Sequence, residues 1–312
     1  MMQDNARKLT YGAMMVAIFV VLVMISFYIP LFGTITMLFI PLPIILYRLR
    51  YDRKASLLVT LAAILVSLIG GILLVFVALV FGALGFVIGE AIQQKRTKFY
   101  TFMASGLTFL ISTILIYYLS VVLFGINSIE VFYQMMEESQ QQVMTYINQI
   151  GEVPDEVSKQ LYATFDATLK AVPTAFILSC YLFALVVILI NLPIAKRLGH
   201  DVPTFPAFRE MKLPVLIVWV YMLIILMPLL FGVESDSMAE LIYINASFLL
   251  RFLFFLQGIA FIHHVIHTLK PRKWLPILAT LVAFLFSPFI VILGILDTGL
   301  NLRALISKNN SR

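Results

Sequence analysis

Residues 71–90 read GILLVFVALVFGALGFVIGE and carry no charged side chain before Glu90 at the end. About 20 apolar residues of helix are needed to cross a hydrocarbon core of about 30 Å, so this stretch is long enough to span a membrane. At helical spacing its small residues share one face, whereas the bulky ones lie elsewhere. We therefore predict a membrane helix with a glycine seam, defined here as Ala78, Gly82, Gly85 and Gly89.

The glycine seam predicts a close contact with another helix. In lipid, apolar burial does not drive helices together, and small residues permit the backbone approach that van der Waals contact requires. The alternative is that the seam borders a cavity that ends at Glu90. For Glu90 itself two interpretations are open, an ion pair with the basic loop within reach or a role in proton coupling.

The composition places the chain in the polytopic membrane class. Hydrophobic residues make up 62% of the chain and charged residues 12%, and the mean hydropathy is +1.01. The net charge of +6 does not indicate nucleic-acid binding, because the lysines and arginines occur in short clusters between apolar runs. The first apolar run, which reaches Ile29, is too long for a signal peptide and is expected to remain as the first span.

The apolar runs predict an all-α, polytopic membrane helix bundle of about eight to ten membrane segments, with an external amphipathic helical hairpin. The segments are expected near residues 9–29, 34–47, 55–70, 71–92, 99–124, 171–195, 213–232 and 241–268, with a last one from 274. Pro41, Pro43 and the Gly70–Gly71 pair predict tilted or broken helices in the second and third segments. We therefore expect the chain to have three parts, which are an N-terminal transmembrane module (1–125), an external insert (126–170) and a C-terminal transmembrane module (171–312).

Basic residues predict which side of the membrane each loop faces. Most of the 22 lysines and arginines lie in five alternate segments, at 7–8, 48–54, 95–98, 196–212 and 270–273. The opposite loops carry most of the acids, including Glu234 and Asp236. We therefore place the N-terminus in the cytoplasm.

The C-terminal end departs from this charge pattern. A single crossing that starts at Trp274 would leave Arg303 and the basic residues after it outside, against the positive-inside bias. A break at Ser287–Pro288 would instead make a hairpin or a re-entrant pair with a cytoplasmic tail. We favour the second arrangement.

Residues 126–170 form the one sizeable polar insert of the sequence and are predicted to be external. Apolar residues recur at helical intervals over 129–150 and again over 157–169, and Asn127 and Glu130 are spaced as a capping box. The pattern predicts two amphipathic helices. Their apolar faces are expected to lie either on the lipid headgroups or over the mouth of the bundle as a lid.

Arg251 points most directly to a function. It interrupts the apolar centre of residues 242–269, and an intramembrane arginine is costly unless it is paired or hydrated. We interpret it as facing an outward-open cavity and binding a carboxylate or phosphate on a ligand. The alternative is an arginine that snorkels to headgroups or pairs with an acid such as Asp297. The candidate ligand-binding residues are Arg251, Ser247, Gln257 and Asn245, of which the last two are rotated about 120° from Arg251 around the helix.

Signatures of catalysis and metal binding are missing from the sequence. There is no nucleophile elbow, phosphate loop, Rossmann glycine pattern or pair of carboxylates. His263 and His267 are one helical turn apart, but the glutamate of a zincin helix and further ligands are absent. The single cysteine, Cys180, cannot form an intramolecular disulfide. We therefore expect no enzyme activity, no cofactor and no metal site.

Four short stretches resemble the YybS-like proteins, a bacterial family of predicted membrane proteins of unknown function. They are RKLTYGA at 7–13, PLP at 41–43, FLQGIAF at 255–261 and GILDTGLNLR at 294–303. That family in turn is similar to the substrate-binding S-components of energy-coupling-factor (ECF) transporters, chiefly in its N-terminal helices. The resemblance implies that residues 1–125 are an S-component-like module and that Ala13 and Ala17 on the first helix dock a coupling subunit.

Two functions remain open. The resemblance and Arg251 favour a small-molecule capture or transport component of the bacterial plasma membrane, with an anionic small molecule as its ligand and ATPase coupling subunits as partners. The alternative is a non-transporting membrane scaffold or assembly partner, which would bind other envelope proteins through the glycine seam and residues 126–170. Both functions place the chain in the lipid bilayer, and neither involves nucleic acid.

Overall fold

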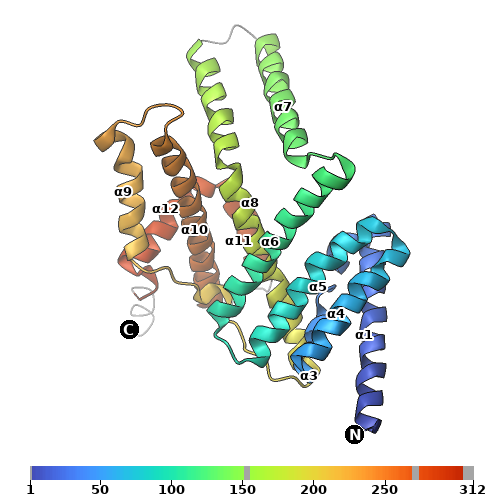
Figure 1. Cartoon of the computed structure of the whole chain (residues 1–312). Helices are drawn as coiled ribbons and strands as arrows, with labels where there is room; N and C mark the ends of the chain where they lie inside the picture. Colours follow the sequence, from blue (N-terminus) through green and yellow to red (C-terminus); the bar gives the residue numbers. More distant parts are fainter. Residues whose placement is uncertain (1, 151–154, 269–273, 305–312) are drawn as a thin grey trace. The chain divides into compact units, whose positions relative to one another are not determined.

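The computed structural model describes residues 2–150, 155–268 and 274–304. Over these residues the chain folds into α-helices and two short 3-10 helices, with no strand (Figure 1). The α-helices are α1 (Met2–Tyr28), α2 (Pro30–Met37), α3 (Leu42–Arg50), α4 (Arg53–Val66), α5 (Ile72–Gln93), α6 (Lys98–Phe124), α7 (Ser128–Ile150), α8 (Asp155–Arg197), α9 (Leu216–Phe231), α10 (Met238–Thr268), α11 (Leu275–Leu285) and α12 (Ser287–Leu300). The 3-10 helices are η1 (Ser67–Gly70) and η2 (Phe208–Glu210).

Seven helical segments are long and apolar enough to cross a membrane: Asn5–Tyr28, Pro30–Arg50, Arg53–Gly70, Ile72–Gln93, Lys98–Phe124, Glu156–Arg197 and Met238–Thr268. α11 and α12 form a further apolar pair that bends by 110°, and α9 is a shorter apolar helix of 16 residues. The predicted all-α, polytopic membrane fold is therefore confirmed.

The helix breaks lie where the prolines and glycines predict them. α2 ends at Met37, and α3 begins after Pro41 at its N-cap. Gly71 separates η1 from α5 with a φ of +112°, which glycine adopts without the clash that a Cβ would cause. α12 begins at Ser287 with Pro288 in its first turn, which confirms the predicted break there.

The chain divides into two compact units. Unit 1 holds residues 1–134 and 177–205, and unit 2 holds residues 135–176 and 206–312. The domain boundaries expected near 125 and 170 lie close to residues 134 and 176, where the chain passes from one unit to the other. Residues 177–205, however, pack with the N-terminal helices rather than with the C-terminal module, because Ile188 of α8 is buried in the same core as Phe19 of α1 and Leu84 of α5.

The glycine seam makes the predicted close helix contact inside unit 1. A Cβ at Gly85 would lie 2.7 Å from the carbonyl oxygen of Pro41, and one at Gly89 would lie 2.8 Å from the Cβ of Arg48. Both glycines therefore lie against α3 and the turn before it. Gly82 faces α4 instead, and all four seam residues are buried. The packed interface is confirmed, and a cavity along the seam does not fit these contacts.

We expect Gly85→Ala to destabilise unit 1 by about 1–3 kcal/mol, since the added methyl group meets backbone atoms that cannot move aside. Gly82→Ala on the same helix is the matched control. Its Cβ would lie 3.2 Å from the methyl carbon of Thr60, a side-chain atom that can shift, so its cost should stay below about 1 kcal/mol. Thermal unfolding of the purified variants in detergent measures both costs, and equal losses would contradict the assigned contacts.

The polar insert, residues 126–170, begins as predicted. Asn127 precedes α7 and caps it, because its Oδ1 accepts from the Glu130 N–H at 3.2 Å and its Nδ2 donates to the Glu130 carboxylate at 3.2 Å. The Tyr117 hydroxyl donates to the same Asn127 oxygen at 2.9 Å. The first amphipathic helix is therefore confirmed. The turn expected after it, at residues 151–154, lies outside the described residues.

α8 differs from the prediction. The second amphipathic stretch and the span expected from residue 171 form one continuous helix of 43 residues, about 65 Å long. Pro173 lies inside this helix without ending it. Two elements were expected because the side-chain pattern changes from amphipathic to apolar, but that change reflects what surrounds a helix and does not interrupt its backbone. Since a hydrocarbon core is about 30 Å thick, part of α8 lies outside it.

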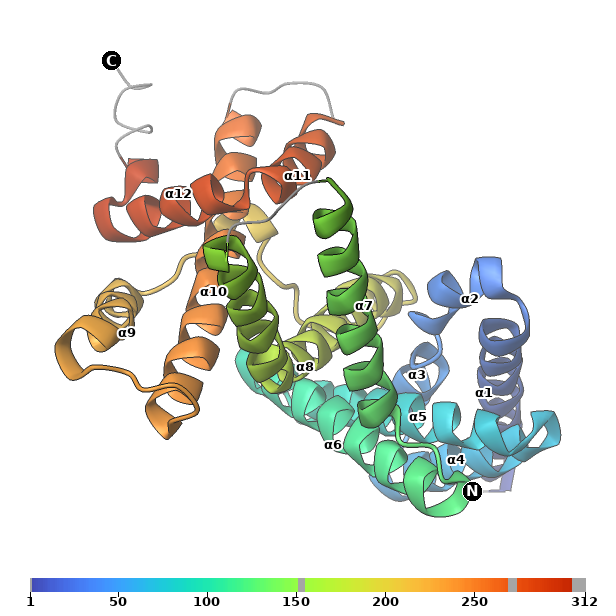
Figure 2. The same cartoon turned by 90° about the horizontal axis from the view of Figure 1, so that it is seen from above.

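Unit 2 is organised around α10, which packs against α9, α11 and α12 (Figure 2). α12 lies directly against the backbone of α10. A Cβ at Gly294 would overlap the carbonyl oxygen of Phe254, and one at Gly258 would overlap that of Ile290. The Phe254 ring is fully buried and lies 5.2 Å from the ring of Tyr221 on α9. Two glycines thus let α12 cross α10 in backbone contact.

Candidate functional site

Arg251 lies in the middle of α10, about 20 Å along the axis from Met238 at 1.5 Å per residue. Its side chain is exposed. The ion pairs formed by the described residues do not include it. Asp297, which was considered as its partner, instead binds Arg303 at 3.0 Å. Pairing with that acid therefore does not account for this intramembrane arginine.

The structure does not gather the other predicted ligand residues around the exposed arginine. Asn245 Nδ2 donates to the Lys170 carbonyl oxygen at 3.1 Å, and Asn245 Oδ1 accepts from Thr174 at 2.5 Å, so this amide joins α10 to α8. Ser247 is buried and donates to a carbonyl of its own helix at 3.1 Å. Gln257 is buried in a different cluster, described below. All three side chains already have partners within unit 2.

A cluster of charges joins α8 to the start of α10. Lys170 Nζ lies 2.7 Å from the Asp166 carboxylate and 2.8 Å from those of Asp236 and Glu240. One cation therefore serves three acids, and the cluster carries an excess of negative charge. It holds two helices of unit 2 together but would repel an anionic ligand, so Lys170 does not extend the candidate site of Arg251.

A second polar cluster, which we call the inner cluster, consists of Gln257, Asp297 and Arg303, all buried. Asp297 Oδ2 accepts from Gln257 Nε2 at 2.6 Å and from Arg303 Nε at 3.0 Å. Gln257 Oε1 accepts from the Leu213 N–H at 3.1 Å, and Arg303 Nη1 donates to the Arg209 carbonyl oxygen at 2.7 Å. The inner cluster thus ties α10 and α12 to the segment that precedes α9.

Two charged atoms of the inner cluster, Asp297 Oδ1 and Arg303 Nη2, have no hydrogen-bond partner within the described part of the chain. In a two-bond fork between a guanidinium and a carboxylate these atoms would pair. Here Arg303 Nε and Gln257 Nε2 both donate to Asp297 Oδ2, and the fork stays open. The sequence marks Arg303 as a topology signal and as the last residue of the 294–303 stretch that resembles the YybS-like proteins, but neither places it beside Asp297. The missed signal was Asn301, whose left-handed backbone, with a φ of +50°, ends α12 and turns the chain.

Glu90 forms the predicted ion pair at the end of the glycine seam. Its Oε2 accepts from Arg48 Nε at 2.6 Å, and Arg53 Nε lies 3.7 Å from its other oxygen. Arg48 is buried and also donates to the Tyr51 carbonyl oxygen at 2.8 Å. The interpretation of Glu90 as one half of an ion pair is confirmed, but its partners are Arg48 of α3 and Arg53 of α4 rather than the adjacent basic residues 95–98.

His263 joins α10 to α11. Its Nε2 lies 2.8 Å from Thr280 Oγ1 and 3.1 Å from the Pro276 carbonyl oxygen. Its ring lies 5.8 Å from that of Phe208 in η2. The Nε2 atom of His263 is therefore engaged in contacts between elements of unit 2.

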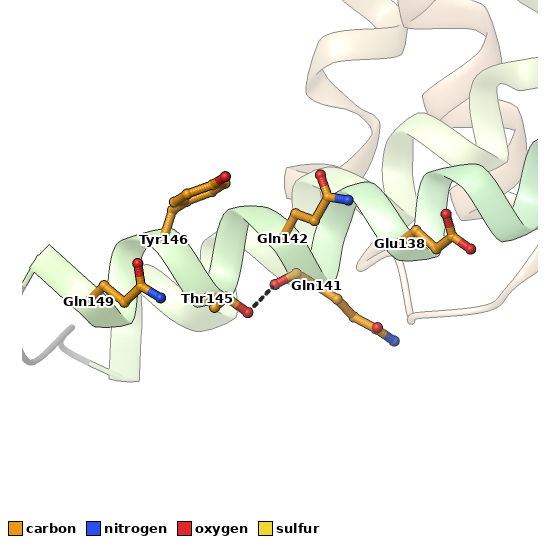
Figure 3. Close-up of a pocket in the computed structure, with 6 residues that line it drawn as sticks. All are labelled: Glu138, Gln141, Gln142, Thr145, Tyr146 and Gln149. Atoms are coloured by element: carbon orange, nitrogen blue, oxygen red, sulfur yellow. Dashed lines mark hydrogen bonds between the residues drawn. The ribbon is translucent and has the colours of Figure 1, made fainter.

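An open hollow lies on α7 (Figure 3). The side chains that line it are Glu138, Gln141, Gln142, Thr145, Tyr146 and Gln149. Figure 3 shows that all of them project from this one helix, where Thr145 Oγ1 donates to the Gln141 carbonyl oxygen at 2.8 Å. Because a single helix supplies the whole lining, the hollow is the polar face of an amphipathic helix rather than an enclosed binding site.

Comparison with known proteins assigns the chain to a family. The family model described as "Predicted membrane protein (DUF2232)" matches residues 17–298. The chain belongs to this DUF2232 family. It is also 28% identical over 307 residues to the "Uncharacterized protein YybS" of Bacillus subtilis (strain 168), an alignment that covers 96% of this chain and 98% of that protein. No solved structure matches the chain. The resemblance to YybS-like proteins is therefore confirmed.

Two of the four stretches that resemble the YybS-like proteins meet in the structure. Residues 255–261 of α10 contribute Gln257 and Gly258, and residues 294–303 contribute Gly294 and the two charged members of the inner cluster. The glycine contacts and the inner cluster together form one junction between α10 and α12. In this DUF2232 protein, the two stretches are therefore parts of a single packing unit.

Proposed function

We propose that this DUF2232 protein is a non-enzymatic capture or transport component of the bacterial plasma membrane, with a cytoplasmic N-terminus and an anionic small molecule as its ligand. The observation that carries the proposal is the exposed guanidinium of Arg251 in the middle of α10, without an ion-pair partner in the described ranges. The basic residues in alternate loops support the orientation, and a role in transport is proposed from the resemblance of the sequence motifs to S-components.

The energetic argument for Arg251 is the cost of leaving a charge in hydrocarbon. Insertion scales give about 2.5–3.5 kcal/mol for an arginine at the centre of a membrane helix. Asp297 does not offset this cost, because it is bound to Arg303. A carboxylate or phosphate on a ligand would form charge-assisted, two-bond contacts with the guanidinium and would recover the cost on binding.

The test compares Arg251→Gln with Arg251→Lys by native mass spectrometry of the protein purified in detergent. We expect a small molecule that bears a carboxylate or phosphate to leave the membrane with the wild-type protein. Arg251→Gln should bind it at least about tenfold more weakly, which corresponds to about 1.4 kcal/mol, whereas Arg251→Lys keeps the charge and part of the affinity. Arg96→Gln, which removes another exposed charge, is the matched control and should bind as the wild type does.

Arg251→Gln should also keep the unfolding temperature of the wild type, because its exposed side chain makes no ion pair in the part of the chain that the structure describes. An unstable Arg251→Gln variant would indicate a structural role. Full retention of the ligand by that variant would equally contradict the proposal.

A partner for such a component would dock on α1. Ala13 and Ala17 lie on an exposed face of this helix, whereas Met15 and Phe19 are buried. Small residues one helical turn apart permit the close approach of a second helix. By analogy with S-components, we propose this face as the contact for a transmembrane coupling subunit that joins the protein to cytoplasmic ATPases.

A second candidate function is a non-transporting scaffold for envelope proteins. The glycine seam does not serve it, because the seam is packed against α3 and α4 within unit 1. The observation in favour is the exposure of apolar side chains on α7, with 50% for Ile129, 40% for Phe132 and 64% for Met135. The same mass spectra separate the two functions, since a co-purifying membrane protein without a small molecule would favour the scaffold.

A further inference from the structure

α11 and α12 are each too short to cross a membrane alone. α11 has 11 residues and α12 has 14, which give about 16 Å and 21 Å of helix against a hydrocarbon core of about 30 Å. The two helices are bent by 110° between Leu285 and Ser287, so they do not combine into one straight span.

The tip between the two helices carries exposed apolar side chains. Leu285 is 80% exposed, Phe286 53% and Phe289 68%. Three backbone donors at the tip are paired, because the Phe286 N–H bonds to the Val282 carbonyl and the N–H groups of Phe289 and Ile290 bond to that of Phe286. A turn with paired backbone donors and an apolar surface is compatible with hydrocarbon.

Both ends of the pair lie beside the same part of α10. The first turns of α11 contact His263, whose Nε2 lies 2.8 Å from Thr280 Oγ1. The last turn of α12 contacts Gln257, whose Nε2 donates to Asp297 at 2.6 Å. Gln257 and His263 are about 9 Å apart along the axis of α10, well under the thickness of the hydrocarbon core.

The end of α12 is also fixed to the segment that precedes α9. Arg303 donates to the Arg209 carbonyl oxygen at 2.7 Å, and the Leu213 N–H donates to Gln257 at 3.1 Å. This segment follows the basic residues at the end of α8 and leads into the apolar α9. The end of α12 and the entry to α9 therefore lie together in unit 2.

From these contacts we infer that α11 and α12 form a re-entrant hairpin, which enters and leaves the membrane on the side of residues 206–215, and that the inner cluster is the clamp that holds its end. The inference does not rest on the anion-binding proposal. It places Arg303 on the side of the basic residues 196–212, which the positive-inside bias also assigns to the N-terminus. The last apolar segment therefore adds no crossing, and the charge pattern holds through Arg303.

The test measures from which side of the membrane single cysteines react with a membrane-impermeant maleimide, in the full chain with Cys180→Ala as background. Glu210→Cys reports the side of the segment before α9. Glu234→Cys reports the opposite side, because it precedes Met238 at the start of α10, whereas Leu213 is bonded to Gln257, about 28 Å further along that helix. Ala304→Cys reports the end of α12, and Leu285→Cys reports the tip. All four positions are exposed, so the substitutions disturb little packing.

In intact cells and in inverted membrane vesicles, Ala304→Cys is expected to react with the same sidedness as Glu210→Cys. Leu285→Cys is expected to react at least about tenfold more slowly than either from both sides, because it lies in hydrocarbon. The inference is overturned if Ala304→Cys reacts with the sidedness of Glu234→Cys, or if the tip reacts as fast as Glu234→Cys. A cysteine appended after Arg312 repeats the measurement without any change next to the clamp.

Discussion

The Asp297→Asn variant is expected to lose about 3–5 kcal/mol of stability, the cost of removing one partner of a buried ion pair. Its amide would leave the guanidinium of Arg303, which is 4% exposed, buried beside a neutral group. Arg303→Gln should have a similar effect, because it leaves the Asp297 carboxylate buried with only Gln257 as a donor. The stability lost in either single variant measures the cost of leaving one charge buried without its partner. It does not measure how much the ion pair itself stabilises the fold.

The double variant Asp297→Asn/Arg303→Gln separates these two quantities. Because it removes both charges, it should recover much of the stability that either single variant loses. Thermal unfolding in detergent, read as a double-mutant cycle, measures the coupling. A double variant as unstable as the worse single variant would contradict a charge clamp, and so would an Asp297→Asn variant of wild-type stability.

Asp52→Asn is the matched control, since it breaks an ion pair that is exposed. The Lys8 ammonium donates to Asp52, and this bond, with a second from the Ala55 N–H, holds the pKa of Asp52 below its usual range. A lowered folded-state pKa contributes stability above the ordinary pKa, which is lost as the pH falls through the lowered value. Because solvent screens exposed pairs, this contribution is small, and the variant should unfold close to the wild-type temperature at neutral pH.

The spans and their breaks could be predicted from the sequence because they depend on local properties. The length of an apolar run sets whether a helix can cross, as for residues 71–90. The backbone freedom of Gly71 and the missing N–H of Pro288 set where helices end. The glycine seam was predictable for the same reason, since helical spacing alone brings Gly82, Gly85 and Gly89 to one face.

The partners of the polar side chains could not be predicted in this way. Helical periodicity places Asn245 and Gln257 around α10, but it does not say which neighbouring element covers each face. α8 bonds the first and α12 the second, and both assignments depend on contacts between segments far apart in the chain. The same limit applies to Arg303, whose role follows from a turn after α12 that returns it to Asp297. Arg251 could be singled out from the sequence because its cost depends on its own helix.

Gly294→Ala is expected to cost about 3 kcal/mol, at the upper end of overpacking effects, although it adds a single methyl group. The new Cβ would overlap the carbonyl oxygen of Phe254, which belongs to the backbone of α10 and cannot rotate away. The clash is relieved only if α12 moves off α10, and that movement also separates Gln257 from Asp297 in the inner cluster. Unit 2 should therefore lose its glycine contact and its clamp together.

Gly299→Ala, further along α12, shows whether this loss comes from the contact or from the change of residue type. A Cβ at Gly299 would meet no atom within 4 Å, and alanine favours a helix over glycine by up to about 1 kcal/mol. This variant should therefore be as stable as the wild type or slightly more stable in the same thermal unfolding experiment. If Gly294→Ala unfolds at the temperature of Gly299→Ala, α12 is not in backbone contact with α10. The glycine contact then does not hold the inner cluster in place.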